Sequence, residues 1–416
     1  MSLQIETAMS DTASFKQHLD KILALESTRR IVDEAEAAGV FPRSIVELLG
    51  REGIFAAKWQ DRPVPALEHT LALSERFGRL GAGGIASGVT LHDSAIAMLR
   101  RFGRSDRLRE VADQAIAGRA VLCISATEAG AGSDMLGLAS TAVRENGGYR
   151  LRGHKKMASP SPIADYIVLA LRGTDESHAG RDDLALFLVP TSQLRVGKQF
   201  ATVGARSIST APVFFDTWVP AEMMIARPGT GLAVLSMALA QERFAMAAQI
   251  VGACQLALGV TVARMKRRKS FGATLFDHQA LRLRVADLQA RVDMMRLALN
   301  GLIAEGAGFN VRSASAAKVS VVRLGGEVMS ECMHIFGSAG VLESESPLGR
   351  WWRDVKMARI GGGTDEMLWE IVAAGLEPDY ANYDRLIDEW QPEQAFGLQP
   401  TEPQATEPQA AERQAG

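Results

Sequence analysis

This sequence has few cysteines, no histidines at metal-binding spacing and little net charge. Its three cysteines (Cys123, Cys254, Cys332) lie far apart among 416 residues, so they form neither a disulfide framework nor a CxxC metal pair. The seven histidines show no HxxH or HExxH spacing, and we predict no metal site. The net charge of -2 gives no sign of a nucleic-acid-binding surface. These absences favour a reducing, cytoplasmic location.

Long apolar runs are also scarce. The first twenty residues contain early acids and no apolar stretch, which predicts neither a secretory signal nor a transit peptide. One segment, Phe244 to Ala263, carries no charge and is followed by the basic run RMKRRK, as a membrane span would be. It is alanine-rich and contains Gln249, Gln255 and Thr261, so we predict a buried core helix and no membrane span.

The pattern of apolar residues changes twice along the chain. Up to about Ala120, apolar residues recur every three or four positions, which predicts helices. From Val121 the chain reads as short strands, including a hairpin at Asn146-Gly147-Gly148. Helices return near Gly229, and the repeated TEPQA segment near the C-terminus has no apolar periodicity. We therefore predict a helical domain over 1–120, a β domain over 121–228, a helical domain over 229–383 and a disordered tail over 384–416.

Two segments of the sequence could carry chemistry. SATEAGAGSD (Ser125 to Asp134) follows a strand and has small residues that would let its backbone lie flat against a ligand, although such a loop is often only a turn. Glu242 and Arg243 are the only charged residues from Pro228 to Ala263. They form either a structural ion pair or a carboxylate base with a cation in an apolar pocket, where burial would raise the carboxyl pKa.

Three further segments are rich in small or basic residues. RMKRRKSFG (Arg264 to Gly272) reads as a basic helix end that also suits a pyrophosphate. HIFGSAG (His334 to Gly340) ends a helix with small residues. RIGGGTDEM (Arg359 to Met367) places three glycines before Thr364, a good helix N-cap, and is either a plain loop or a ligand cradle.

In this order, these segments resemble the motifs of the acyl-CoA dehydrogenase family of flavoproteins. The resemblance spans roughly Phe41 to Glu377 and rests on five segments: SATEAGAGSD, LRGHKKMASPSPIADY, VGARSISTAPVFFDTWVPAEMMI, KRRKSFGATLFDHQA and WRDVKMARIGGGTDEM. It implies an α+β fold with an N-terminal helical domain, a central β-barrel-like domain and a C-terminal four-helix bundle. It also implies an oxidoreductase that acts on a CH–CH bond of an acyl thioester, in fatty acid or branched acyl metabolism.

The resemblance further implies FAD as cofactor, held partly by a neighbouring subunit, and hence a homodimer or homotetramer. The isoalloxazine side would involve Ile124, Ala126, Thr127, Gly132, Ser133, Met157 and Ser159, with Thr364 and Glu366 completing the site. The diphosphate and adenosine would be held by Arg268, Ser270, Phe271, Leu275, His278, Gln279, His334 and Gly337. Ser133, Arg243, Gly362 and Gly363 would contact the substrate, which is carried on CoA or on a carrier protein. An electron-transfer flavoprotein or oxygen would accept the electrons.

The sequence departs from the family pattern at the base that removes the substrate's α-proton. Most members have glutamate where this chain has Gly362, and an aromatic residue where it has Gly361; Met157 replaces a tryptophan and Ala129 a proline. Members resembling isovaleryl-CoA and long-chain acyl-CoA dehydrogenases carry the base before the substrate-site arginine instead, which points to Glu242. Two alternatives stay open: a flavin-dependent monooxygenase of the same fold, which needs no such base, and a non-catalytic flavoprotein subunit.

Overall fold

The N-terminal part of the chain is helical, as its apolar spacing predicts. The computed structural model describes residues 11–174 and 184–387. Asp11 caps the first helix by accepting hydrogen bonds from the N–H groups of Ala13 and Ser14, and Ser105 caps a later one. The helices are α2 (Thr12–Ala24), α3 (Glu26–Ala38), α4 (Arg43–Arg51), α5 (Ile54–Trp59), α6 (Leu67–Gly78), α7 (Gly83–Phe102) and α8 (Asp106–Ile116).

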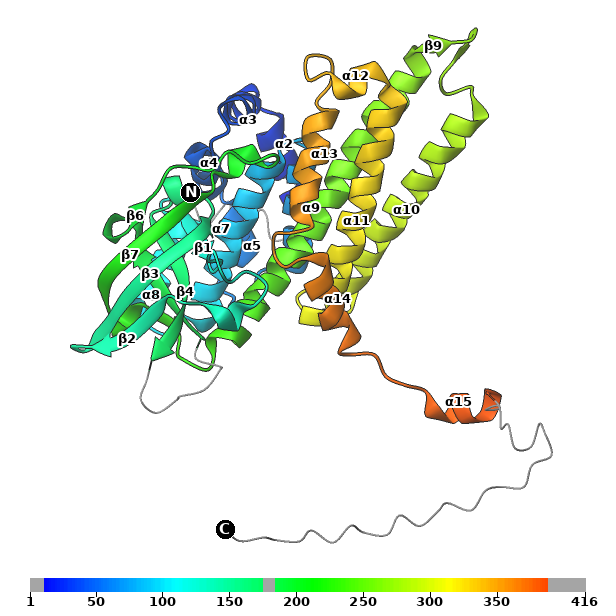
Figure 1. Ribbon diagram of the computed structural model, residues 1–416. Helices are drawn as coiled ribbons and strands as arrows, with labels where there is room; N and C mark the ends of the chain where they lie inside the picture. The colour runs from blue at the N-terminus through cyan, green and yellow to red at the C-terminus, as the bar shows by residue number, and fades with distance from the viewer. Residues whose placement is uncertain (1–10, 175–183, 388–416) are drawn as a thin grey trace, which may run out of the picture. The chain divides into compact units, whose positions relative to one another are not determined.

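An eight-stranded sheet follows in the middle of the chain (Figure 1). Its strands are β1 (Leu122–Ser125), β2 (Thr141–Glu145), β3 (Gly148–Ala158), β4 (Tyr166–Thr174), β5 (Leu184–Pro190), β6 (Arg195–Val196), β7 (Ala211–Pro220) and β8 (Met224–Ala226). The order is β6-β7-β3-β2-β4-β5-β8, with β1 pairing in parallel with β4. The predicted hairpin is present: Glu145 pairs with Gly148, and Asn146 and Gly147 both have positive φ, as a two-residue turn requires.

The third part of the chain is a bundle of long helices. It consists of α9 (Gly231–Arg267), α10 (Gln279–Ala304), α11 (Val311–Phe336), α12 (Ser338–Val341), α13 (Leu348–Ala358) and α14 (Asp365–Ala373), with the small hairpin of β9 (Lys269–Ser270) and β10 (Ala273–Thr274) after α9. Helices α9, α10, α11 and α13 pack on one another. The helix–sheet–helix order and this bundle confirm the predicted fold class.

Helix α9 is the predicted core helix. Among the described residues it alone is long and apolar enough to cross a membrane by length and composition, and 67% of its most apolar 18-residue window is buried. It packs on α6, α7, α10 and α11. Glycine makes the contact with α6 possible, since a Cβ on Gly78 would lie 1.9 Å from the carbonyl oxygen of Gln249, and one on Gly252 would lie 2.0 Å from that of Glu75.

The described residues up to Ala374 form one compact unit, and those from Gly375 belong to another. The second unit contains α15 (Tyr380–Leu386), so helical structure extends past the predicted limit at residue 383. The predicted disordered tail lies, from residue 388 on, outside the described residues. The limits of the individual domains stay predictions.

Candidate functional site

Glu242 lies buried on α9, directly opposite the glycine turn at residues 361–363. Its side chain is 4% exposed, and within residues 11–174 and 184–387 it has no hydrogen-bond or ion-pair partner. A Cβ built on Gly362 would stand 3.1 Å from Oε1 of Glu242. Even the first side-chain carbon of a residue at position 362 would crowd this carboxylate, so the glycine leaves room for Glu242.

The glycine turn has a backbone that few other residues would adopt. Gly362 and Gly363 have φ values of 67° and 108°. Arg243 Nε donates a hydrogen bond to the carbonyl oxygen of Gly362 (2.9 Å), and Thr364 caps α14 as predicted. No acceptor among the described residues takes the N–H of Gly362. That N–H is thus available to a ligand carbonyl beside the Glu242 carboxylate.

The charges around Glu242 suit a base. Burial raises the pKa of Glu242, while Arg243 and Lys318 act in the opposite direction. A buried carboxylate whose pKa is raised accepts a proton from carbon more readily than an exposed one. Arg243 itself is turned onto Gly362 and the Ser315 hydroxyl (3.2 Å), and its predicted contact with substrate stays a prediction.

The predicted isoalloxazine residues of the β domain lie side by side. Ile124 forms an isolated β-bridge with Ser159, and the Ser125 hydroxyl donates to the carbonyl oxygen of Met157 (2.9 Å). Lys156 N–H donates to the carbonyl oxygen of Thr127 (2.9 Å), which brings the loop onto the end of β3. The structure therefore brings together the strand β1, the loop that follows it and the end of β3.

A buried ion pair fixes this loop, and it was not anticipated from the sequence. Glu128 accepts hydrogen bonds from Lys155 Nζ (2.6 Å) and from the N–H groups of Ala139 (2.7 Å) and Ser140 (3.1 Å). Burial acts to raise the pKa of Glu128, but these hydrogen bonds hold it below its usual value. Burial lowers the pKa of Lys155 to about 8. Loop and strand are locked together by this pair.

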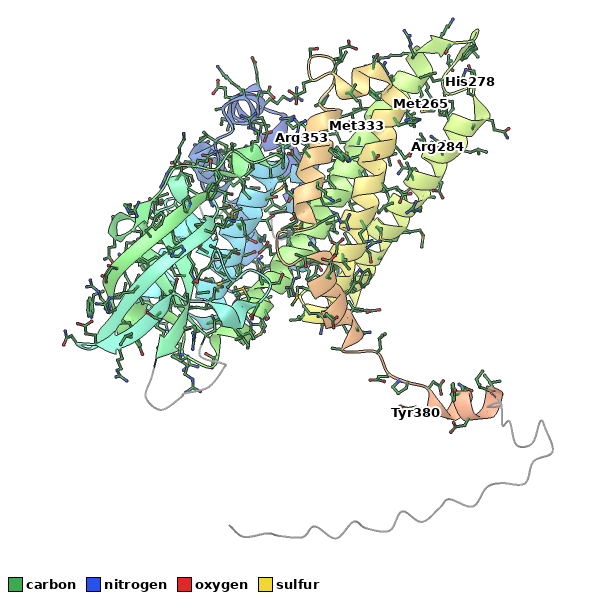
Figure 2. The ribbon with its side chains drawn as sticks, in the orientation of Figure 1. Met265, His278, Arg284, Met333, Arg353 and Tyr380 are labelled. Carbon is green, nitrogen blue, oxygen red and sulfur yellow. The ribbon has the colours of Figure 1, made fainter. Side chains whose placement is uncertain are left out.

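The residues predicted to hold the diphosphate and adenosine form a second group, here called the bundle-tip cluster: Arg268, Ser270, Phe271, Leu275, His278, Gln279, His334 and Gly337. Leu275 N–H donates to the carbonyl oxygen of Arg268 (2.8 Å), and His278 Nε2 lies 3.1 Å from the carbonyl oxygen of Ser270. Arg264 binds the carbonyl oxygen of Phe336 (3.1 Å), which joins the end of α11 to this cluster. Figure 2 shows His278 at the end of the bundle remote from the sheet.

The bundle-tip cluster and Glu242 are far apart within one chain. Glu242 lies on α9, and the cluster begins just beyond the C-terminal end of this helix; from Glu242 to Arg267 the helical rise spans roughly 38 Å. One copy of the chain therefore does not assemble all the predicted cofactor residues around a single Glu242.

The donor set of the two groups fits FAD. In the β-domain loop, a Cβ on Gly130 would meet nothing within 4 Å, so the space beside this part of the loop is open. In the bundle-tip cluster, the Arg268 guanidinium has no acid or carbonyl partner among the described residues and is free to bind phosphate oxygens. Phe271 is 98% exposed and meets the ring of His278 edge-on, with 6.5 Å between the ring centroids, so most of its apolar ring is open to a ligand or a partner.

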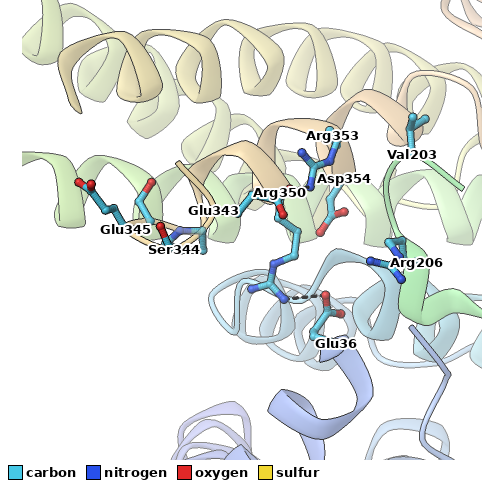
Figure 3. A pocket seen from close by; sticks show the side chains of 11 residues that line it. Glu36, Val203, Arg206, Glu343, Ser344, Glu345, Arg350, Arg353 and Asp354 are labelled. Atoms are coloured by element: carbon cyan, nitrogen blue, oxygen red, sulfur yellow. Dashed lines mark hydrogen bonds and ion pairs between the residues drawn. The ribbon is translucent and has the colours of Figure 1, made fainter. Parts of the chain in front are cut away.

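A cavity of about 480 Å³ lies elsewhere, between α3, the loop around Arg206 and α13 (Figure 3). Its charges are largely paired: Glu36 with Arg350 and Glu343 with Arg353, both at 2.7 Å. No predicted cofactor, substrate or base residue lines it. The described residues also contain no group of three or more potential metal ligands.

Comparison with known proteins decides between the possible families. Residues 123–218 match the model of the acyl-CoA dehydrogenase middle domain, and residues 229–377 match that of its C-terminal domain. The acyl-[acyl-carrier-protein] dehydrogenase MbtN of Mycobacterium sp. (strain MCS) is 54% identical over 85% of this chain and 91% of its own length. The chain belongs to the acyl-CoA dehydrogenase family. The predicted resemblance is thereby confirmed.

More distant members of the acyl-CoA dehydrogenase family also match. The long-chain specific acyl-CoA dehydrogenase of Mus musculus is 25% identical over 83% of this chain and 82% of its own. The crystal structure of an acyl-CoA dehydrogenase from Geobacillus kaustophilus superimposes with a TM-score of 0.81, at 25% identity, over 88% of this chain and 98% of its own. Both comparisons span all three structural parts.

Two residues around the glycine turn were not predicted from the sequence. Lys318 and Ser315 on α11 reach Gly363 and Arg243, respectively. A signal was present for Lys318, because it stands four residues after Ala314 and four before Val322, on the apolar face of α11. A lysine at a core position of a helix is the pattern that would have identified it.

Proposed function

We propose that this protein is an FAD-dependent dehydrogenase that introduces a Cα–Cβ double bond into an acyl thioester, with Glu242 as the base. The observation that carries the assignment is the position of the Glu242 carboxylate. It is buried, unpaired among the described residues, and occupies the place that Gly362 leaves open. The curated relatives above 50% identity are named as dehydrogenases of acyl groups.

The residues of the site divide the chemistry among them. The N–H of Gly362 would donate to the thioester carbonyl oxygen and favour the enolate-like charge that develops there. Glu242 would take the α-proton on its carboxylate, and burial keeps water from competing for it. FAD, when bound, would accept the β-hydride. Arg243 holds the carbonyl of Gly362 and so orients the turn.

We further propose that the acyl group is presented on an acyl carrier protein. Support comes from the relatives at 51–54% identity, which are named acyl-[acyl-carrier-protein] dehydrogenases. A cytoplasmic location fits the three cysteines, which are all free and buried. We propose an electron-transfer flavoprotein or oxygen as the electron acceptor.

The flavin-dependent monooxygenase is the second candidate, and the glycine at position 362 favours it. The buried carboxylate of Glu242 argues against it, because oxygen chemistry at a flavin gives no reason to bury an unpaired acid beside the substrate turn. The same carboxylate argues against a non-catalytic subunit.

We also propose a homo-oligomer, a dimer or tetramer, in which the bundle-tip cluster of one copy completes the cofactor site of another. The separation of the cluster from Glu242 supports this arrangement. So does exposed apolar surface on the bundle, which includes Leu283, Met294 and Leu297 on α10 and Met367 and Trp369 on α14.

The decisive experiment is anaerobic bleaching of the bound flavin with matched acyl-carrier-protein and acyl-CoA thioesters. We expect stoichiometric FAD in the purified protein and fast reduction by the carrier-bound acyl group. Reduction by acyl-CoA alone would overturn the carrier proposal. A flavin that no acyl thioester reduces, but that reacts with oxygen once reduced and hydroxylates a substrate, would support the monooxygenase instead.

Charge reversal at the bundle tip tests the shared cofactor site. We expect Arg268→Glu to weaken FAD binding at least tenfold, because a bidentate guanidinium–phosphate contact is lost and an acid faces the diphosphate. Helical content should be unchanged, since Arg268 is exposed. Arg30→Glu, an exposed arginine on α3, is the matched control. Equal FAD affinity in both variants, by flavin fluorescence titration, would remove Arg268 from the site.

A further inference from the structure

Lys318 on α11 is fully buried, which is rare for lysine unless its charge is used. Among the described residues its only hydrogen bond is from Nζ to the carbonyl oxygen of Gly363, at 2.7 Å. Burial lowers the pKa of Lys318 to about 8, against the opposing influence of Asp365 and Glu242. The lysine is therefore still charged at neutral pH. Burying that charge costs free energy, which contacts within the site must offset.

Two cationic side chains, from two different helices, bind successive carbonyl groups of the glycine turn. Arg243 of α9 binds the carbonyl of Gly362, and Lys318 of α11 binds that of Gly363. Because both glycines have positive φ, the turn has no strong backbone preference of its own and depends on such outside contacts. The contacts place Gly362 against the Glu242 carboxylate.

Of the acids that face Lys318, one has no partner of its own among the described residues. These charges are Glu242 and Arg243 of α9, Asp365 of α14 and Arg359 after α13. Arg359 Nε already binds Asp365 (2.7 Å), and Arg243 is engaged by Gly362 and Ser315. Asp365 is the stronger influence on Lys318, but it is already paired with Arg359. Glu242 has no hydrogen-bond or ion-pair partner among the described residues, and the charges of Arg243 and then Lys318 favour its ionised form.

We propose that Lys318 is a positioning residue that holds the glycine turn against Glu242 and, through its charge, adds to Arg243 in favouring the ionised form of Glu242. This rests on the proposed function, in which ionised Glu242 is the base. The two groups titrate together, because each charge favours the other. Without the charge of Lys318, the ionised form of Glu242 is less stable, so the Glu242 carboxyl keeps its proton up to a higher pH. The pH at which the rate of flavin reduction begins to rise should therefore be higher.

Three substitutions separate the two roles. Lys318→Met removes donor and charge, Lys318→Gln keeps a donor without charge, and Lys318→Arg keeps both. Single-turnover flavin reduction is measured from pH 6 to 9.5, with exposed Lys356→Met as the matched control. We expect Met and Gln variants to be slower than the parent by about tenfold at pH 6 and by less than about threefold above pH 9, where the lysine of the parent is itself neutral. The Arg and control variants should follow the parent.

A readout independent of turnover is the protonated-carboxyl infrared band of Glu242, assigned by its loss in Glu242→Gln and titrated in the flavin-free protein. This band should persist to higher pH in the Lys318→Met and Lys318→Gln variants than in the parent. Amide hydrogen exchange across residues 360–368 should be faster in Lys318→Met and close to that of the parent in Lys318→Gln. An unshifted band, or a rate loss equal at all pH values, would overturn the proposal. If no thioester reduces the parent flavin, the proposed function fails, and the infrared titration still decides the Lys318–Glu242 coupling.

Discussion

Glu242→Gln is expected to slow flavin reduction by the preferred acyl thioester at least about a hundredfold, the usual contribution of a general base. The amide keeps the size of the side chain but cannot accept the α-proton. Because burial raises the pKa of Glu242, the parent rate should increase with pH as this carboxyl loses its proton, and the variant should lack that limb. Stopped-flow absorbance of the flavin measures both.

The control for this variant is Glu370→Gln, an exposed acid on α14. FAD content should be equal in both. A side chain at position 362 would crowd the Glu242 carboxylate. Gly362→Glu should therefore restore part of the rate only in a double variant that also carries Glu242→Ala. The recovery should be partial, since a φ of 67° costs a non-glycine residue about 1 kcal/mol or more. Unchanged reduction in Glu242→Gln would make Glu242 structural.

Lys155→Met is expected to reduce the free energy of unfolding by about 3 kcal/mol or more, because it leaves the Glu128 carboxylate buried without its cation. The loop from Ser125 to Asp134 should lose its attachment to β3, so FAD affinity should fall as well. Chemical denaturation and flavin titration give the two quantities.

The neighbouring Lys156 is exposed and serves as the control, with Lys156→Met expected within about 0.5 kcal/mol of the parent. Adding Glu128→Gln to Lys155→Met should recover part of the loss, since no charge is then buried without its partner. The single amide oxygen still accepts from one of the N–H groups of Ala139 and Ser140, which bind different oxygens of Glu128 in the parent. A Lys155→Met protein as stable as the parent would show that this pair contributes nothing to the fold.

Local chemistry in the sequence was enough to predict the order of elements. Apolar residues at helical spacing predict α9, and Asn146-Gly147 predicts the β2–β3 hairpin, because both signals act over a few neighbouring residues. The short strands β6 and β8 were not predicted. Each has only two or three residues, and such strands are defined by the partner they pair with rather than by their own composition.

For the candidate site, too, some residues could be predicted from the sequence and others could not. Thr364 as an N-cap is visible in the sequence, and the role of Glu242 could be inferred only through family likeness. Lys155 and Lys318 escaped, because a lysine is normally solvated and nothing local shows that a carboxylate or carbonyl from a distant segment will meet it. Pairings between segments far apart in the chain appear only when the fold is known.

The distance along α9 between Glu242 and the bundle-tip cluster has a consequence for handling the protein. If two copies share each cofactor, then association of the copies and retention of the flavin are linked by mass action. Diluting the protein should release FAD, and adding FAD should drive separated copies back together. The yellow colour of a preparation would then depend on its concentration, and activity measured at nanomolar protein would underestimate the enzyme.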